Sequence, residues 1–436
     1  MSQYFKVGNS HIWVLGCLVA AYSHVACAND TFQNSTHIDP LLGLDFSSTM
    51  TADYGHNDNV FFQHNANIVG SDYYDLKPTF SIQGQRNTKK FSISYQGDYR
   101  KYTKDTIDNN NYADHHINGI FDWELGFRHH LKIKGNYTIG HEALGTGVTN
   151  GFSFENNGNL DDSATFNYFN INKDLAKIDK NVSVKYTYGA KGAKGNLVFE
   201  LTQNRLDYDI LNSYASSFQH YLKDENVKEN DAIVTFEHHY SDHTHFDYTL
   251  KYKKYDYLDP TRNNNELIAA FTIMSQMTGK SKIEATIYKL EKKMATSNFS
   301  GVNWSVLYKW QPVDYSTITL KTLSEVKEPD NLGDFVQSYQ NSITWDHQFL
   351  GHISGHLSYK HENDAYHIRK RKDKYDYLNL SISYLFRPKV EFILGYQYTL
   401  FHTDNSSDPV YIDGDFYKRN LGYEQNQFGL SVKVAI

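Results

Sequence analysis

Residues 91–100 read FSISYQGDYR, and this stretch decides the fold class. Its odd-numbered positions, from Phe91 to Tyr99, carry three rings, one isoleucine and one glycine, whereas its even-numbered positions, from Ser92 to Arg100, are all polar. A period of two residues is typical of a β-strand with two unlike faces, because an amphipathic helix would repeat every ~3.6 residues. The stretch therefore predicts a strand that is aromatic on one face and hydrophilic on the other.

The same alternation continues from about residue 44 to the carboxyl terminus, and residues 245–253 and 428–436 are further clear examples. A composition with 35 tyrosines, 26 phenylalanines and only 7 prolines in 436 residues also favours strands. The alternating runs predict strands at 44–57, 72–85, 90–102, 113–127, 130–141, 178–190, 195–210, 228–241, 245–257, 264–276, 281–292, 300–311, 315–326, 337–347, 352–363, 373–386, 390–403 and 417–436. We therefore predict an all-β fold with eighteen antiparallel strands.

The connections between these runs are of two kinds, which alternate along the chain. Tight polar turns, such as 86–89 and 387–389, take turns with longer segments rich in Asn and Asp, such as 103–112 and 404–416. This alternation is typical of a membrane barrel whose hairpins have short periplasmic and long extracellular ends. An even strand count then places both termini in the periplasm.

One segment leaves the strand count open. Residues 166–171 (FNYFNI) also look like a strand, and counting them as a crossing would make the number odd. We therefore assign them to a long extracellular loop at about 142–177, as a hairpin folded over or into the mouth of the barrel. Sixteen or twenty strands remain the alternatives.

Residues 1–28 have the form of a secretion signal. The basic residue Lys6 is followed by an apolar run at 12–21 and by the small-residue sequence Ala-Cys-Ala that ends at Ala28. We expect cleavage after Ala28, which leaves a periplasmic segment at 29–43 in front of a barrel at 44–436. No later stretch offers 18 consecutive apolar residues, which argues against a helical membrane span.

Both cysteines lie in the segment that we expect to be removed. The mature chain would lose Cys17 and Cys27 and would need neither disulfides nor thiol chemistry. The alternative makes Cys27 a lipid-carrying amino terminus, but the three residues before it lack the leucine expected there. A secreted chain without cysteine predicts the outer membrane of a Gram-negative bacterium as its location.

Strands with alternating apolar and polar residues also form soluble β-sandwiches. The lengths of the connections and the aromatic content of the apolar face distinguish a sandwich from a membrane barrel. A sandwich favours compact aliphatic side chains and tight turns at both ends. Here about half of the connections are long and the apolar face is rich in rings, which barrels carry as two girdles at the water–lipid boundary. We predict a transmembrane outer-membrane β-barrel, with the candidate girdle residues Trp123, Trp304, Trp310, Trp345, Tyr359 and Tyr396.

A barrel of this size encloses water, whereas a barrel of about eight strands is filled by its own side chains. The hydrophilic face is then the candidate pore lining, and it carries many Ser, Thr, Asn and Gln besides mixed charges. Its charged candidates are Asp98, Arg100, Lys185, Glu237, Asp247, Lys251, Lys253, Lys309, Lys360, Glu391 and Glu424. The balance of 43 basic against 50 acidic residues gives no electrostatic reason to expect a nucleic-acid partner.

Catalytic signals are weak. The chain contains no phosphate loop, no Gly-x-Ser-x-Gly and no His-Glu-x-x-His. Four histidines cluster around one tight turn, namely His238, His239, His243 and His245. They could bind a metal, but their turn would simply protrude into the periplasm. We predict a protein that is not an enzyme and that has no metal and no cofactor.

Two short motifs resemble one family of proteins. Residues 54–61 (YGHNDNVF) are similar to the Tyr-x-x-Asn/Asp-Asp-Asn-Val-Phe opening of a family of outer-membrane β-barrel porins found in exopolysaccharide and capsule gene clusters. Residues 417–420 (YKRN) are similar to the approach of that family to its final strand, although Ile436 stands where the family ends on an aromatic residue. The resemblance implies an eighteen-stranded porin that passes a secreted polysaccharide and has no catalytic residues.

The expected partners follow from this resemblance and from the barrel. They are outer-membrane lipid, the secreted polysaccharide, periplasmic polysaccharide-export and co-polymerase proteins, and the outer-membrane assembly machinery. Three alternatives stay open: a general or oligosaccharide-uptake porin, an outer-membrane hydrolase, and an adhesin that uses its long loops.

Overall fold

Eighteen long strands form one closed antiparallel barrel, which confirms the predicted fold class and strand count. The computed structural model describes residues 38–41, 43–64, 68–154, 165–294, 298–328 and 335–436. The signal peptide expected at 1–28 lies outside the described residues, as does most of the segment 29–43. Within the described part of the chain, no helix is both long enough and apolar enough to cross a membrane.

The barrel strands follow one another around the ring in chain order. They are β2 (Leu44–Asn57), β3 (Ser71–Arg86), β4 (Lys89–Tyr102), β5 (Tyr112–Gly126), β6 (His129–Glu142), β7 (Leu175–Tyr188), β8 (Gly195–Tyr208), β9 (Val227–His239), β10 (Thr244–Tyr257), β11 (Asn264–Thr278), β12 (Ser281–Met294), β13 (Asn298–Val313), β14 (Ser316–Lys327), β15 (Val336–Leu350), β16 (Ile353–Tyr366), β17 (Lys372–Arg387), β18 (Val390–Thr403) and β21 (Tyr423–Ala435). Because β21 pairs with both β18 and β2, the ring has no open edge. Closure of this kind satisfies the backbone hydrogen bonds that an open sheet edge would expose.

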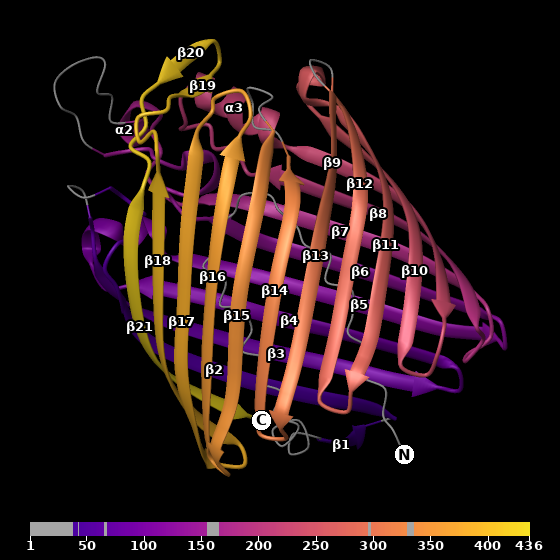
Figure 1. Cartoon of the computed structure of the whole chain (residues 1–436). Helices are drawn as coiled ribbons and strands as arrows, with labels where there is room; N and C mark the ends of the chain where they lie inside the picture. Colours follow the sequence, from indigo (N-terminus) through magenta and orange to yellow (C-terminus); the bar gives the residue numbers. More distant parts are fainter. Residues whose placement is uncertain (1–37, 42, 65–67, 155–164, 295–297, 329–334) are drawn as a thin grey trace.

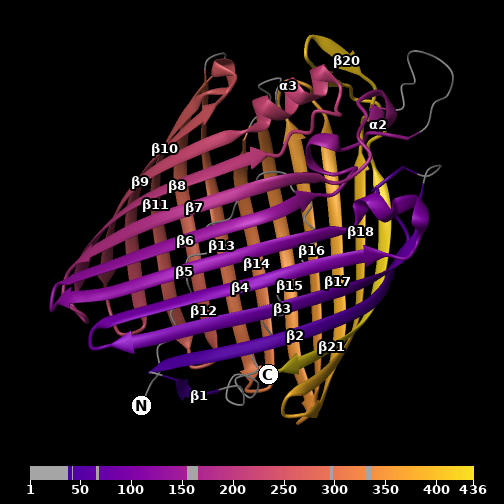
Figure 2. The ribbon, with the colours of Figure 1, turned by 180° about the vertical axis from the view of Figure 1, so that it is seen from behind.

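The barrel has two unlike ends (Figure 1). One end, which we call the tight-turn end, carries short connections such as 87–88 and 388–389, and β2 begins there and β21 ends there. The other, the long-loop end, carries the connections 143–174, 209–226 and 404–422. In Figure 2, which shows the barrel from behind, the short helices again gather at the long-loop end.

The predicted strand bounds are close to the observed ones with one exception. β2 and β18 begin and end at the predicted residues, but β21 begins at Tyr423 rather than at 417. The backbone leaves the sheet before Tyr423 because Gly422 has a φ of 101° and Leu421 donates its N–H to the carbonyl of Ser406. Residues 415–417 instead form β20 (Asp415–Tyr417), a short strand paired with β19 (Val410–Ile412).

The remaining elements are short. They are β1 (Ile38–Leu41), which pairs with β2, the 3-10 helices η1 (Asp105–Asn110), η2 (Gly147–Thr149) and η3 (Pro260–Arg262), and the α-helices α2 (Thr165–Tyr168) and α3 (Ser216–Glu225). The segment 166–171 lies in the loop between β6 and β7, to which it was assigned, but the expected hairpin is wrong because the segment forms α2 and the turn after it. Phe166, Phe169 and Ile171 are buried among other rings, so their spacing reflects packing in a loop.

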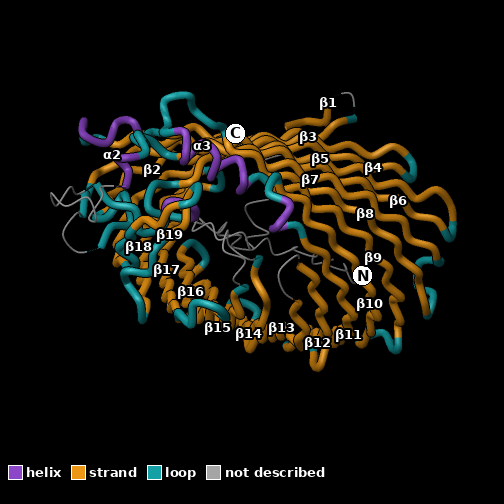
Figure 3. The backbone as a smooth tube through the Cα atoms, turned by 90° about the horizontal axis from the view of Figure 1, so that it is seen from above, coloured by secondary structure: helices purple, strands orange, loops and turns teal. Residues whose placement is uncertain are grey.

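The long loops fold together into a packed structure, which we call the cap and define as the described residues of 143–174, 209–226 and 404–422. Phe169 stacks on Phe218 with ring centroids 5.4 Å apart and on Phe152 with centroids 5.9 Å apart. The same apolar cluster includes strand-end residues such as Tyr208 and Tyr255. The cap therefore packs onto the strands of one side of the long-loop end, as the view from above shows (Figure 3).

Candidate functional site: the inner wall of the barrel

Alternation along each strand separates an outer face from an inner face. On β10, Tyr248, Leu250 and Tyr252 are 47%, 60% and 46% exposed and lie on the outside. The residues between them, Lys251 and Lys253, point the other way and make ion pairs with the neighbouring strand β9. Every barrel strand repeats this arrangement, with either its odd-numbered or its even-numbered residues on the inner face, because successive side chains of a strand point to opposite faces.

The register places most of the predicted pore-lining residues on the inner face. These are Asp98, Arg100, Lys185, Glu237, Asp247, Lys251, Lys253, Lys309, Lys360 and Glu391. They do not meet at one place, because they come from strands all around the ring and from different heights. Their role in lining a pore remains a prediction.

The prediction for Glu424 is wrong. Glu424 pairs with Leu400 across β18 and β21, and it shares its face with Phe428 and Leu430, which are 52% and 53% exposed on the outside. The even-numbered residues of β21 face outward along the whole strand, so Glu424 projects outward at the long-loop end. A residue on that face does not line the interior.

The predicted girdle residues lie on the outer face, and all of them except Trp304 lie in the half of the barrel nearest the tight-turn end. Trp123, Trp310 and Trp345 lie within five residues of the tight-turn ends of β5, β13 and β15. Tyr359 and Tyr396 lie six residues from the tight-turn ends of β16 and β18, and Trp304 lies nine residues from that end of β13. Trp304, Trp310 and Tyr359 are 38%, 42% and 41% exposed. Their role at a lipid boundary remains a prediction.

The motif Asn57-Asp58-Asn59 closes the seam between β2 and β21. Asp58 accepts hydrogen bonds from the backbone N–H of Asn426 (2.7 Å) and from its side-chain amide (2.8 Å). Asn59 donates to the carbonyl of Glu424 at 2.8 Å, and its own N–H donates to Asn57 Oδ1 at 2.9 Å. The motif on which the family resemblance partly rests thus hydrogen-bonds the end of the first barrel strand to the last barrel strand.

A first buried ion-pair cluster lies on the inner wall of β2 to β4. Arg100 binds both carboxylate oxygens of Asp75, at 2.6 and 2.7 Å, and its guanidinium lies 3.9 Å from the ring centre of Tyr73. Lys77 contacts Asp75 at 3.0 Å and Asp53 at 2.8 Å. Two cations and two carboxylates therefore neutralise one another. The bidentate pairing of Arg100 with Asp75 also fixes the orientation of the guanidinium.

A second cluster lies on the inner wall of β9 to β12. Lys253 contacts Glu229 at 2.8 Å, and Lys251 contacts Asp231 at 2.8 Å. On β12, Lys292 is fully buried, with its ammonium 2.9 Å from Glu266 and also bonded to Glu328. Because Glu328 follows β14, this bond ties the connection after β14 back to the wall.

A third cluster lies on the inner wall of β14 and β16. Lys327 contacts Asp364 at 2.6 Å and also binds Glu362. Glu362 lies 3.0 Å from Lys360, whose ammonium is 4.0 Å from the ring centre of Tyr377. All three clusters lie in the half of the barrel nearest the long-loop end. Their charges are largely compensated, so they do not form a lining of one sign.

The counter-ions in these clusters were not among the residues predicted from the sequence. Arg100, Lys251 and Lys360 were named, but their partners Asp75, Asp231 and Glu362 were not. The signal that could have identified these counter-ions was a side chain of opposite charge on the inner face of the adjacent strand. That signal becomes specific only when the register of the two strands is known.

A buried carboxyl group ties the cap to β6. Asp174 accepts the N–H of Leu144 at 2.9 Å, and its other oxygen lies 3.9 Å from His141 Nε2. His141 Nδ1 in turn lies 2.9 Å from Asp114. Burial raises the pKa of Asp174 to about 6, so this end of the loop 143–174 changes its charge in a mildly acidic medium.

Three arginines converge on one carboxylate at the long-loop end. Asp408 binds Arg371, and it lies 3.1 Å from Arg369 and 3.2 Å from Arg419. Arg371 also contacts Asp373 at 3.0 Å. Burial and the neighbouring cations lower the pKa of Arg369 to about 10. The densest basic run of the sequence, 369–372, therefore uses its arginines to hold the loop 404–422.

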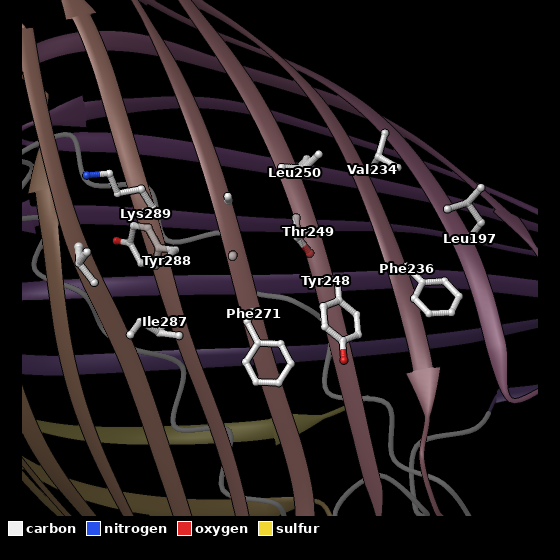
Figure 4. A pocket seen from close by; sticks show the side chains of 13 residues that line it. Leu197, Val234, Phe236, Tyr248, Thr249, Leu250, Phe271, Ile287, Tyr288 and Lys289 are labelled. Carbon is white, nitrogen blue, oxygen red and sulfur yellow. The ribbon is translucent and has the colours of Figure 1, made fainter.

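A shallow apolar hollow lies on the outside of β8 to β13 (Figure 4). Leu250, Phe271 and Ile287 line it, and the small side chain of Ala269 leaves the space. Leu250 and Ile287 are 60% and 55% exposed. An apolar surface of this breadth is unusual on a soluble monomer and suits contact with hydrocarbon chains.

The described residues contain no group of three or more His, Cys, Asp or Glu side chains arranged to hold a metal ion. His239 and His245 of the histidine turn have ring centres 4.6 Å apart and form an aromatic contact.

No family model matches the chain, and no curated protein matches it either. Among solved structures, it is similar to the FrpB iron transporter from Neisseria meningitidis (F5-1 variant), with 9% identity, a TM-score of 0.50, and coverage of 94% of this chain and 84% of that one. It is also similar to Pseudomonas aeruginosa OpdK with vanillate, with 11% identity, a TM-score of 0.48, and coverage of 90% and 99%. Pseudomonas aeruginosa OpdQ has 10% identity, a TM-score of 0.48, and coverage of 91% and 98%. At such identities the likeness extends to the fold alone.

Proposed function

We propose that the protein is an outer-membrane channel through which an exopolysaccharide or capsular polysaccharide leaves a Gram-negative cell. One observation carries the proposal: a closed ring of eighteen strands presents exposed rings and aliphatic side chains on the outside and polar side chains on the inside. Closed barrels of this size enclose an aqueous lumen, and an apolar outer band suits lipid. The long-loop end then faces the outside of the cell.

The inner wall supports a hydrated, hydroxyl-rich solute. The three ion-pair clusters compensate their own charges, so they create no strong field that would select ions of one sign. Much of the remaining inner face is Ser, Thr, Asn and Gln, for example Thr344, Ser358 and Asn379. Hydroxyls and amides exchange hydrogen bonds between water and sugar hydroxyls at little net cost.

The channel would work passively with partners that the cell supplies. The polymer would be made and driven at the inner membrane, and periplasmic polysaccharide-export and co-polymerase proteins would deliver it to the tight-turn end. The outer-membrane assembly machinery would insert the barrel, and outer-membrane lipid would surround it. No step in this proposal needs a cofactor or a catalytic residue in the barrel.

Deletion of the gene tests the proposal. Secretion predicts that the surface polysaccharide is lost while polymer accumulates in the periplasm, and that a plasmid copy restores both. An unchanged amount of surface polysaccharide overturns the proposal. If growth on an oligosaccharide slows instead, the uptake porin is the better explanation, because such a porin would use the same polar lumen in the opposite direction.

The alternatives of other classes predict different results. A hydrolase would cleave lipid, peptide or glycan as a purified protein, and one inward Ser, His or Asp substitution would abolish that activity. An adhesin would lose attachment when its long loops are shortened, with its ion conductance in a lipid bilayer unchanged. Neither alternative predicts polymer in the periplasm of the deletion strain.

A further inference from the structure

Two rows of uncharged hydrogen-bonding side chains climb the inner wall. Each row consists of residues that lie opposite one another in the register of adjacent strands. The first row is Ser47, Ser81, Ser94, Asn118, Asn136, Asn181 and Asn204, on β2 to β8. The second row is Thr319, Thr344, Ser358, Asn379, Gln397, Gln427 and Asn57, on β14 to β18, β21 and β2. We call them row one and row two.

Every member of both rows is an amide or a hydroxyl, which is not true of the adjacent rows. The inner-face row next to row one on the side of the long-loop end contains Gln96, His116 and Asp179, and the row on the other side contains Ile120 and Lys134. Small uncharged side chains thus follow one path across seven consecutive strands, between flanking rows that carry charged or apolar residues.

The rows rise from the tight-turn end toward the long-loop end. Ser47 lies three residues from the tight-turn end of β2, whereas Asn204 lies nine residues from that end of β8. Thr319 lies three residues from the tight-turn end of β14, and Gln397 lies seven from that end of β18. The rise is a consequence of the strand stagger of a closed barrel, which makes a row perpendicular to the strands spiral around the axis.

Part of row one is already ordered by its own hydrogen bonds. Asn136 donates to Asn181 Oδ1 at 2.9 Å, and Asn181 donates to Asn204 Oδ1. Asn118 and Asn136 are nevertheless exposed on the inner face. Amides held in this way lose less conformational freedom when they contact a solute. Their neighbours along the row follow at the inter-strand spacing of about 4.8 Å.

We propose that the exposed and half-buried members of rows one and two are contact tracks for an uncharged, hydroxyl-rich stretch of saccharide chain as it passes along the lumen. This inference rests on the proposed function and adds the residues and the chemistry of the contact. Each amide or hydroxyl that is not buried offers a hydrogen bond that is weak in net terms, because water competes for it. Asn204, at the end of row one, and Gln427 and Asn57, at the end of row two, are buried and hydrogen-bonded within the protein, so they end the tracks. A continuous series of equal weak contacts lets a chain slide without a deep trap, which charged side chains at these positions would create.

Current recordings through the full mature barrel in planar lipid bilayers test the inference, with maltohexaose as the neutral probe. Saccharide passage predicts transient interruptions of the ion current in the unaltered protein. In the Asn136→Leu variant the mean duration of an interruption should fall about two- to tenfold, the range expected for one lost net hydrogen bond. The open-channel conductance serves as the check that the variant is folded.

The matched control is Gln96→Leu, which removes an inner-face amide that lies outside both rows. This variant should leave the interruption time unchanged. Equal effects of Asn136→Leu and Gln96→Leu, or no effect of Asn136→Leu, overturn the assignment of the rows while leaving saccharide passage intact. An unaltered barrel that conducts ions but shows no interruption at any maltohexaose concentration overturns both the rows and the proposed saccharide channel.

Discussion

Replacement of the buried Lys292 by methionine should strongly destabilise the barrel. The ammonium lies 2.9 Å from Glu266 and also binds Glu328, and the side chain is fully buried. Lys292→Met keeps most of the volume and removes only the charge, so two carboxylates lose their shared cation. Removing one partner of a buried ion pair costs about 3–5 kcal/mol.

The surroundings of Glu328 place the expected loss near the lower end of that range. Glu328 keeps two neutral hydrogen bonds, from Tyr257 Oη at 3.1 Å and from Asn264 Nδ2 at 3.0 Å. We therefore expect a loss of about 3 kcal/mol in the free energy of unfolding. A second variant, Lys292→Met with Glu266→Gln and Glu328→Gln, also removes the two uncompensated carboxylate charges. It should recover most of the lost free energy of unfolding.

The assay is equilibrium unfolding in urea of the barrel in detergent micelles, followed by tryptophan fluorescence. The comparison holds only if the dependence on urea concentration keeps the same slope in all variants. A loss below about 1 kcal/mol for Lys292→Met would mean that water reaches this site and that the cluster is not a buried one. Equal losses in the single and triple variants would show that packing, rather than charge, is responsible.

Three further predictions concern the cap and the outer face. Because burial raises the pKa of Asp174 to about 6, above its usual value of about 4, its contribution to cap stability is present below pH 4 and is lost as the pH rises through 6. Amide exchange within 143–174, corrected for its intrinsic pH dependence, should show this change, and Asp174→Asn should remove it. Asp408→Asn leaves three arginines without their shared carboxylate and should speed proteolysis within 404–422 severalfold, whereas the control Asp413→Asn, which changes an exposed residue of the same loop, should not. Leu250→Arg places a charge on the outer face in the middle of β10 and should lower folding into lipid vesicles by about 2–4 kcal/mol, measured as the folded fraction on unheated gels. Normal insertion of this variant would contradict the lipid-facing assignment.

The family resemblance and the structure agree on the architecture and differ in what they say about the motifs. The resemblance implied an eighteen-stranded barrel, and the ring has eighteen strands. The motif at 57–59 serves to fasten β2 to β21. Asn420, from the second motif, donates its N–H to the carbonyl of Gly151 and so belongs to the cap rather than to a strand. The association with polysaccharide remains a prediction.

The amino-acid sequence by itself determined the strands and their faces. A period of two is a local property of the backbone, so the bounds of β2 and β18 and the outward direction of Leu250 follow from consecutive residues alone. The strand count followed as well, because tight turns and long connections alternate. Glu424 should have been placed outside by the same rule, since it shares its parity with Phe428.

The tertiary structure alone decided what lies beside what. The register of β6 against β7 depends on hydrogen bonds across a connection of 32 residues, and no local pattern fixes it. For this reason neither the row from Asn118 to Asn204 nor the pairing of Lys292 with Glu328 could be predicted from the sequence. Phe169 packs in the cap rather than in a strand. The hydrophobic effect is not directional, so an alternating apolar pattern can be buried equally well by packing within a loop.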